Sequence, residues 1–137
     1  MFSQTAEYAL RAVVFLAESG ETRYTTQTIA DMTRIPPRYL AKVLNSLARA
    51  GILIGQRGIY GGFALSKSPG DISVLEVIQA VDPLKRIYKC PLNLEAHRDQ
   101  LCPLHARLDA SLALIQEDLR RSSVADLLQR PTFRNVG

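Results

Sequence analysis

The chain has 137 residues, with 17 lysines and arginines against 13 aspartates and glutamates, and only two cysteines. An apolar share of 47% with 22% charged residues is ordinary for a globular protein and argues against disorder. No apolar stretch approaches the ~18 residues that a transmembrane helix needs, and two cysteines are too few for a disulfide scaffold. We therefore expect one domain, with or without an appended helix, that has no signal peptide or membrane partner and works in the cytoplasm.

Positive charge is concentrated in one part of the chain. The segment 23–67 holds seven basic residues and one acidic residue, a net charge of +6, whereas the remainder carries −2. A basic segment on an otherwise slightly acidic protein predicts a polyanionic partner on one face. A solvated basic face without any partner has the same charge pattern, so charge alone leaves both interpretations open.

The predicted elements of the first half follow the order of a winged helix-turn-helix. Helices are predicted at about 4–18, 26–33 and 37–50, and strands at 52–54 and 63–65. Ser3 and Thr25 are typical N-cap residues, and Pro36 and Pro37 separate the second helix from the third. The glycine-rich sequence 57–62 forms the tip of the predicted hairpin. We therefore expect a mainly helical fold with a small β-hairpin, in which residues 1–82 form a winged helix-turn-helix DNA-binding domain.

Two of these helices have one apolar face each. In the first helix the apolar positions are Ala6, Ala9, Leu10, Val13, Val14 and Ala17. In the third helix they are Leu40, Val43, Leu44 and Leu47. Both sets follow the spacing of three and four residues that places side chains on one side of a helix, so we expect both faces to be buried.

The second half predicts a different kind of unit. A short helix is expected at 73–81, an ordered sensor loop at 83–101, and a dimerisation helix with a final C-terminal helix within 102–137. The long helix, about 103–121, carries apolar residues at every third or fourth position, namely Leu104, Leu108, Leu112, Ile115 and Leu119. A chain of this size offers little surface for such a helix, so we expect it to pair with a second copy. Packing on its own domain is the alternative.

The third helix is the best candidate for reading base edges in a DNA major groove. Arg38, near its N-terminal end, is placed for a bidentate contact with guanine, whereas Thr25 and Arg49 are placed for phosphates. Arg57, beside the glycines of the hairpin tip, is placed for the neighbouring minor groove. The candidate DNA-contacting residues are Thr25, Gln27, Arg38, Tyr39, Lys42, Asn45, Arg49, Arg57 and Tyr60.

An enzymatic function is not expected. The glycines of 57–62 lie in a predicted hairpin and match neither a P-loop nor the strand-to-helix dinucleotide motif. The sequence also offers no convincing nucleophile–base–acid set of the kind that hydrolases use. A binding function therefore explains the pattern better than catalysis does.

Three segments resemble the Rrf-type family of bacterial transcription regulators: IADMTRIPPRYL at 29–40, RGIYGGF at 57–63 and ISVLEVIQAVD at 72–82. The similarity extends from Glu7 to residue 128. It implies a homodimeric winged-helix regulator that binds a pseudo-palindromic DNA operator, with Tyr39 and Arg57 matching the family's helix and wing residues. Ala41 stands where some members carry glutamate, which leaves the operator sequence open.

The resemblance also implies a sensor. Cluster-binding relatives carry three cysteines spaced C-x5-C-x5-C, often with a histidine three residues later. Cys90, Cys102 and His105 match the outer cysteines and the histidine, but Ala96 replaces the middle cysteine. The resemblance therefore implies a 2Fe–2S cluster with mixed ligation, in which Glu7 of the second subunit is the candidate fourth ligand. His97 and Asp99 are substitutes within the loop.

The residues themselves leave other sensing chemistries open. Cys102 precedes Pro103 at a predicted helix N-terminus, where the helix dipole favours a thiolate, and His105 follows on the same face. Zinc is a lesser alternative for these ligands. A reversible Cys90–Cys102 disulfide would act as a thiol switch, and two inert thiols would leave a cofactor-free repressor or adaptor controlled by a partner protein.

Overall fold

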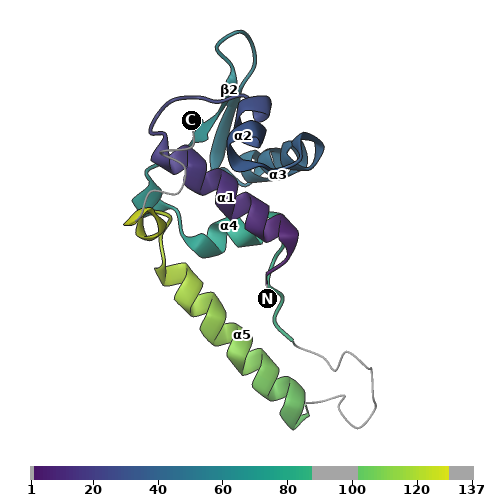
Figure 1. Ribbon diagram of the computed structural model, residues 1–137. Helices are drawn as coiled ribbons and strands as arrows, with labels where there is room; N and C mark the ends of the chain where they lie inside the picture. Colours follow the sequence, from purple (N-terminus) through teal and green to yellow (C-terminus); the bar gives the residue numbers. More distant parts are fainter. Residues whose placement is uncertain (1, 88–101, 130–137) are drawn as a thin grey trace.

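The computed structural model describes residues 2–87 and 102–129 (Figure 1). Its elements are α1 (Gln4–Glu18), α2 (Thr26–Thr33), α3 (Pro37–Arg49), β1 (Leu53–Gln56), β2 (Gly62–Leu65), η1 (Pro69–Asp71), α4 (Val74–Val81), α5 (Pro103–Arg121) and η3 (Ala125–Gln129). The predicted mainly helical fold with a two-stranded hairpin is confirmed. Within the described ranges, no helix combines the length and apolarity that crossing a bilayer requires.

Side-chain caps begin three of the helices. The Ser3 hydroxyl accepts the Ala6 N–H at 3.2 Å, and the Thr25 hydroxyl accepts the Thr28 N–H at 3.2 Å. Each cap satisfies a backbone donor that has no partner within its helix, which stabilises the helix by about 1 kcal/mol. Ser73 does the same for α4. Both caps that the sequence predicts, Ser3 and Thr25, are therefore present.

The turn between α2 and α3 is built from an unusual backbone and two prolines. Arg34 ends α2 with φ of +60°, a left-handed conformation that is found at no other described non-glycine residue. Ile35 then enters the core with 2% of its surface exposed. Pro37 occupies the first turn of α3, where the N–H it lacks would have had no partner. The predicted break between the two helices is confirmed.

The core lies between α1, α2, α3 and α4, and the apolar stripe of α3 supplies much of it. All four predicted stripe residues, Leu40, Val43, Leu44 and Leu47, are buried. Helix α1 is buried more widely than its single predicted face, since Ala12, Phe15 and Leu16 are also buried. The reason is that α1 packs against both α3 and α4, and a helix between two neighbours needs two apolar faces.

The remaining differences concern chain segments without a helical period. Strands β1 and β2 pair antiparallel from Leu53 with Leu65 to Gln56 with Gly62, so both extend further toward the tip than predicted. The last helix, expected as α, is the 3₁₀ helix η3. Immediately before it, Val124 is fully buried in the main hydrophobic core, and its N–H donates to the Ile72 carbonyl at 2.8 Å.

Candidate nucleic-acid interface and sensor region

The outer face of α3 presents a row of polar and basic side chains. Burial of the leucine stripe fixes the rotation of the helix, which leaves Arg38, Lys42, Asn45 and Arg49 exposed. Arg49 donates to the Ser46 hydroxyl at 3.5 Å, whereas Arg38 has no hydrogen bond or ion pair among the described residues. An amphipathic helix with an exposed basic face and a buried apolar face has the form that a major groove accepts.

Tyr39 differs from its neighbours because it lies against α1. Its ring stands edge-on to the Tyr8 ring, with 5.2 Å between ring centroids, and its hydroxyl hydrogen-bonds to the Thr5 hydroxyl. The side chain is only 39% exposed. Tyr39 therefore joins the N-terminal part of α3 to α1, in addition to any contact it makes with a ligand.

The two candidate residues of α2 are exposed but already hydrogen-bonded. The Thr25 hydroxyl caps α2 and donates to the Thr28 hydroxyl at 3.0 Å. The Gln27 amide donates to the Asp31 carboxylate at 2.9 Å. A phosphate contact by the Thr25 hydroxyl would require the exchange of its bond to Thr28, whereas the Gln27 amide has a second N–H for a phosphate.

The hairpin projects beyond the helices and carries Arg57 and Tyr60 at its exposed tip (Figure 1). Its base is fastened to the segment before α2, because the Tyr24 N–H donates to the Phe63 carbonyl at 3.1 Å and the Phe63 N–H donates back at 2.8 Å. Thr25, the cap of α2, follows Tyr24 directly. The wing and the helix-turn-helix therefore hold one position relative to each other.

Sequence reasoning missed a group of α1 residues that contact the helix-turn-helix. Arg11 donates to the Thr33 carbonyl at the end of α2 at 3.2 Å, and its guanidinium carbon lies 5.4 Å from the centroid of the Tyr8 ring. Gln4 donates to the Tyr8 hydroxyl at 2.8 Å. The signal was present in the sequence, since Gln4, Tyr8 and Arg11 have the i, i+4, i+7 spacing of a polar stripe beside the apolar face.

The structure brings two of the four predicted metal ligands together. Cys102 is the N-cap residue of α5, and its sulfur lies 3.2 Å from Nδ1 of His105. Glu7 is exposed in the first turn of α1. In residues 2–87 and 102–129, no three Cys, His, Asp or Glu side chains gather into a metal-binding group. The predicted ligand Cys90 lies outside the described residues.

Helix α5 is joined to the segment that follows α4 by a partly buried ion pair. The Arg86 guanidinium donates to both Asp109 carboxylate oxygens, at 2.6 and 2.7 Å, and the Ile87 N–H donates to the same carboxylate at 2.8 Å. The Arg86 side chain and then the Ile87 N–H hold the pKa of Asp109 at about 2. Gln116 adds a bond to the Leu84 carbonyl at 2.7 Å.

We expect Asp109→Asn to weaken this attachment because asparagine offers Arg86 a single acceptor and no charge. A carboxylate with a lowered pKa stabilises the folded state above the unfolded pKa of about 3.9, and this contribution is lost as the pH falls. The stability difference between wild type and variant, measured by urea unfolding, should be constant above about pH 5 and shrink progressively as the pH falls to about 2. Asp118→Asn, an exposed change on the same helix, is the matched control. A difference that survives unchanged at pH 2 would contradict the assignment.

Part of the surface of α5 is apolar and exposed. No residue of α5 is buried, and Leu104 and Leu108 on its predicted apolar stripe are 63% and 47% exposed. Leu119, at the other end of the stripe, packs against the small cluster of Ala6, Val74 and Ile78. The helix therefore docks on its own domain at one end, and its N-terminal leucines are exposed among the described residues.

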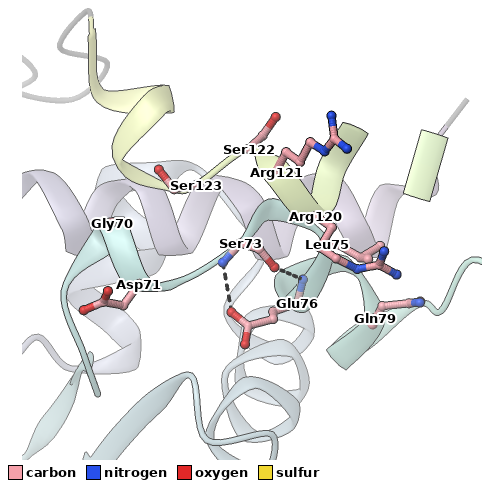
Figure 2. Close-up of a pocket in the computed structure, with 10 residues that line it drawn as sticks. All are labelled: Gly70, Asp71, Ser73, Leu75, Glu76, Gln79, Arg120, Arg121, Ser122 and Ser123. Atoms are coloured by element: carbon pink, nitrogen blue, oxygen red, sulfur yellow. Dashed lines mark hydrogen bonds between the residues drawn. The ribbon is translucent and has the colours of Figure 1, made fainter. Parts of the chain in front are cut away.

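An open pocket of about 500 Å³ lies where α4 begins and α5 ends (Figure 2). On one side, Ser73 and Glu76 form a capping box that occupies the first backbone donors of α4. On the other side, Arg120 and Arg121 both pair with Glu117. No buried side-chain nitrogen or oxygen in the described part lacks a hydrogen-bond partner. The pocket therefore presents no group that awaits a ligand.

Comparisons with known proteins agree with this architecture. The Rrf2 family model, described as an iron-dependent transcriptional regulator, matches residues 2–130. A protein of Aquifex aeolicus (strain VF5) assigned as an HTH-type transcriptional regulator is 28% identical over 131 residues, which cover 93% of this chain and 91% of that protein. These similar proteins are regulators and not enzymes.

Solved structures show the same fold. CymR, the global cysteine regulator of B. subtilis, matches with a TM-score of 0.76 at 22% identity, covering 96% of this chain and 98% of that one. IscR of T. potens matches with a TM-score of 0.75 at 24% identity, covering 96% and 93%. With the family match over nearly its whole length, the chain belongs to the Rrf2 family of winged-helix, DNA-binding transcriptional regulators.

Proposed function

We propose that this Rrf2-family regulator acts as a homodimer on a pseudo-palindromic operator in the cytoplasm. Helix α3 enters the major groove with Arg38 nearest the base edges, and the wing reaches the adjacent minor groove with Arg57. The observation that carries this proposal is the exposed basic face of α3 above its buried leucine stripe. Lys42, Asn45 and Arg49 continue the contact along the helix, Thr25 and Gln27 lie at its margins, and Tyr60 accompanies Arg57 on the wing.

The dimer rests on α5. Leu104 and Leu108 leave a continuous apolar strip exposed at its N-terminal end, and covering it with the same strip of a second chain removes that strip from water. Such pairing is two-fold, because the same patch serves both subunits, and a two-fold protein matches a palindromic site. On this proposal, 1–82 is the DNA-binding domain, 83–101 the sensor loop, and 102–137 the dimerisation region.

The sensor is proposed to be a 2Fe–2S cluster held by Cys90, Cys102, His105 and the partner's Glu7. The residues present fit this donor set, since Cys102 and His105 converge at one helix end with 3.2 Å between sulfur and Nδ1. Thiolate and imidazole ligands together suit a mixed-ligand cluster with a raised reduction potential. Such a group supplies sensitivity to oxidants, iron supply or nitric oxide. Zinc is the lesser alternative.

Helix α1 connects this ligand set to the DNA-contacting face. Glu7 lies on α1 between Thr5 and Tyr8, which both contact Tyr39 at the start of α3. Arg11, one turn further, is bonded to the end of α2. A displacement of α1 would therefore reach both helices of the DNA-binding motif. Ligation of Glu7 changes operator affinity only if it favours one of these arrangements over the other.

The test combines metal analysis with operator binding. Protein purified without oxygen should be coloured, contain iron and sulfide, and bind its operator with an affinity that changes after the iron is removed. Cys102→Ala and His105→Ala should lower the iron content, and Glu7→Gln should alter the absorption spectrum. Glu21→Gln, an exposed change beyond the end of α1, is the matched control. Colourless, iron-free protein from the anaerobic preparation would overturn the cluster, and stoichiometric zinc in it would support the zinc alternative.

The second candidate is a cofactor-free regulator switched by a Cys90–Cys102 disulfide or by a partner protein. The position of Cys102 favours the thiol switch, because its half-buried sulfur lies at the N-terminus of α5 beside His105, and a helix N-terminus favours the reactive thiolate. In the same iron-free protein, oxidant-dependent operator binding that Cys102→Ala abolishes would support the disulfide. Operator binding and regulation that survive alanine at both cysteines would favour the partner protein.

A further inference from the structure

The tip of the wing exposes two large apolar side chains. Ile59 is 95% exposed and Tyr60 is 87% exposed, the highest values among the large hydrophobic residues of the described chain. They are the central residues of a β-turn that the Gly61 N–H closes onto the Gly58 carbonyl at 2.9 Å. Both side chains therefore stand at the outermost point of the hairpin.

This turn departs from ordinary turn chemistry. The central positions of tight turns favour Gly, Pro, Asn, Asp and Ser, which suit the backbone and tolerate water. Ile59 and Tyr60 do not stabilise the fold by burial at these positions, because neither side chain packs against the core. Departures from local rules without a gain in packing are expected at functional positions.

The turn is also held in place. A Cβ at Gly61 would lie 2.3 Å from the Gln56 carbonyl oxygen, and one at Gly62 would lie 2.4 Å from the Tyr24 carbonyl oxygen. These close approaches hold the start of β2 against the end of β1 and against Tyr24. Ile59 and Tyr60 are thus presented at a set position relative to α2 and α3, which is what insertion into a ligand requires.

The charge around the tip indicates the chemical class of the ligand that the tip binds. Residues 32–70 contain six basic residues and no acidic one, and Arg57 lies two residues from Ile59. The strand that leads to the tip, β1, contacts α3, the helix whose basic face the proposed function assigns to DNA. An apolar side chain flanked by positive charge suits the minor groove, whose walls are sugars and whose edges are phosphates. A docking site for another protein would need an apolar patch that continues beyond the tip.

We infer that Ile59 is a wedge that enters the minor groove between base pairs, with Tyr60 against the adjoining sugar. This inference rests on the proposed function and adds a specificity determinant to it. Partial unstacking favours flexible pyrimidine–purine steps, so the wing selects DNA by its deformability at a position where Arg57 supplies only charge. The wedge therefore bends the operator as well as binding it.

The experiment measures affinity, salt dependence and bending on an operator that the wild-type protein selects from random DNA. Ile59→Ala should weaken binding about 10- to 100-fold, the effect of leaving one isoleucine side chain unburied. Its plot of log affinity against log salt should keep the wild-type slope, whereas Arg57→Ala should lower that slope by about 1. Fluorescence energy transfer between the DNA ends should show a smaller bend with Ile59→Ala.

Matched variants distinguish an apolar wedge from a surface that binds another protein. Ile59→Met should retain both affinity and bend because methionine is also an apolar wedge. Ile54→Ala, a 46% exposed isoleucine on β1 at the base of the same hairpin, should change neither. An Ile59→Ala protein with wild-type affinity and bend would overturn the wedge. If that protein also failed to regulate, Ile59 would instead contact a protein partner. The proposed function itself fails only if wild-type protein selects no DNA sequence.

Discussion

Replacing Arg38 by alanine is expected to cost about 1–3 kcal/mol of operator binding, the discrimination that one good bidentate base contact supplies. That loss corresponds to about 5- to 150-fold in affinity. Arg38 is exposed at the N-terminal end of α3 and makes no hydrogen bond or ion pair in the described part of the protein, so its guanidinium is available. Parallel selections from random DNA with wild type and variant should differ at one base position in each half-site.

Arg49→Ala provides the contrast on the same helix. Arg49 lies at the C-terminal end of α3, where a phosphate contact is expected, so its loss should weaken all sequences by a similar factor. The slope of log affinity against log salt should fall by about 1. An Arg38→Ala protein with unaltered affinity and base preference would contradict the placement of α3, since no other residue of the proposal reads bases from that end.

Replacing Gly62 by alanine is expected to have the largest effect on folding. Gly62 has φ of +134°, which a residue with a Cβ adopts at a cost of about 1–3 kcal/mol. The added Cβ would also lie 2.4 Å from the Tyr24 carbonyl oxygen, so the bridge between Tyr24 and Phe63 must open. Urea unfolding followed by circular dichroism should show a loss of at least this size, together with weaker DNA binding.

Gly70→Ala is the matched control, because no atom lies within 4 Å of a Cβ there and its φ needs no glycine. Its free energy of unfolding should stay within about 0.5 kcal/mol of wild type. Equal stability of the Gly62 and Gly70 variants would mean that the wing is not fastened to the segment before α2. That result would also contradict the fixed position of Ile59 relative to α2 and α3.

Features that depend on nearby residues were predictable from the sequence. The Ser3 and Thr25 caps and the stripe from Leu40 to Leu47 follow from spacing, because a cap bonds three residues ahead and a buried face repeats with the helical turn. The exposed position of Arg38 follows from the same stripe, since burying one side of α3 exposes the other. The exposed face of the candidate DNA-contacting helix was therefore accessible to sequence reasoning.

Contacts between distant residues were not predictable in this way. Tyr39 meets Tyr8, and Arg86 meets Asp109, across 31 and 23 positions, and no local period relates such pairs. Val124 lies in the C-terminal segment 102–137, yet it belongs to the main core cluster and hydrogen-bonds to Ile72, 52 positions earlier. Which apolar residue joins the core in this way depends on the packed structure and not on the sequence around the residue.

The attachment of α5 at two places determines how the proposed dimer can move. Asp109 and Gln116 bond the middle of the helix to residues 84–87. Val124, just after the C-terminal end of the helix, bonds to Ile72. The N-terminal end extends away from the domain (Figure 1). Because α5 is attached at two points, it cannot rotate independently of the rest of its subunit. Each subunit of the proposed dimer therefore moves as one rigid body together with its α5. A change of a few degrees in the crossing of the two α5 helices would be magnified into ångströms at the recognition helices. Operator half-sites one helical turn apart, about 34–36 Å, tolerate little such error, which makes the crossing angle an efficient point of control.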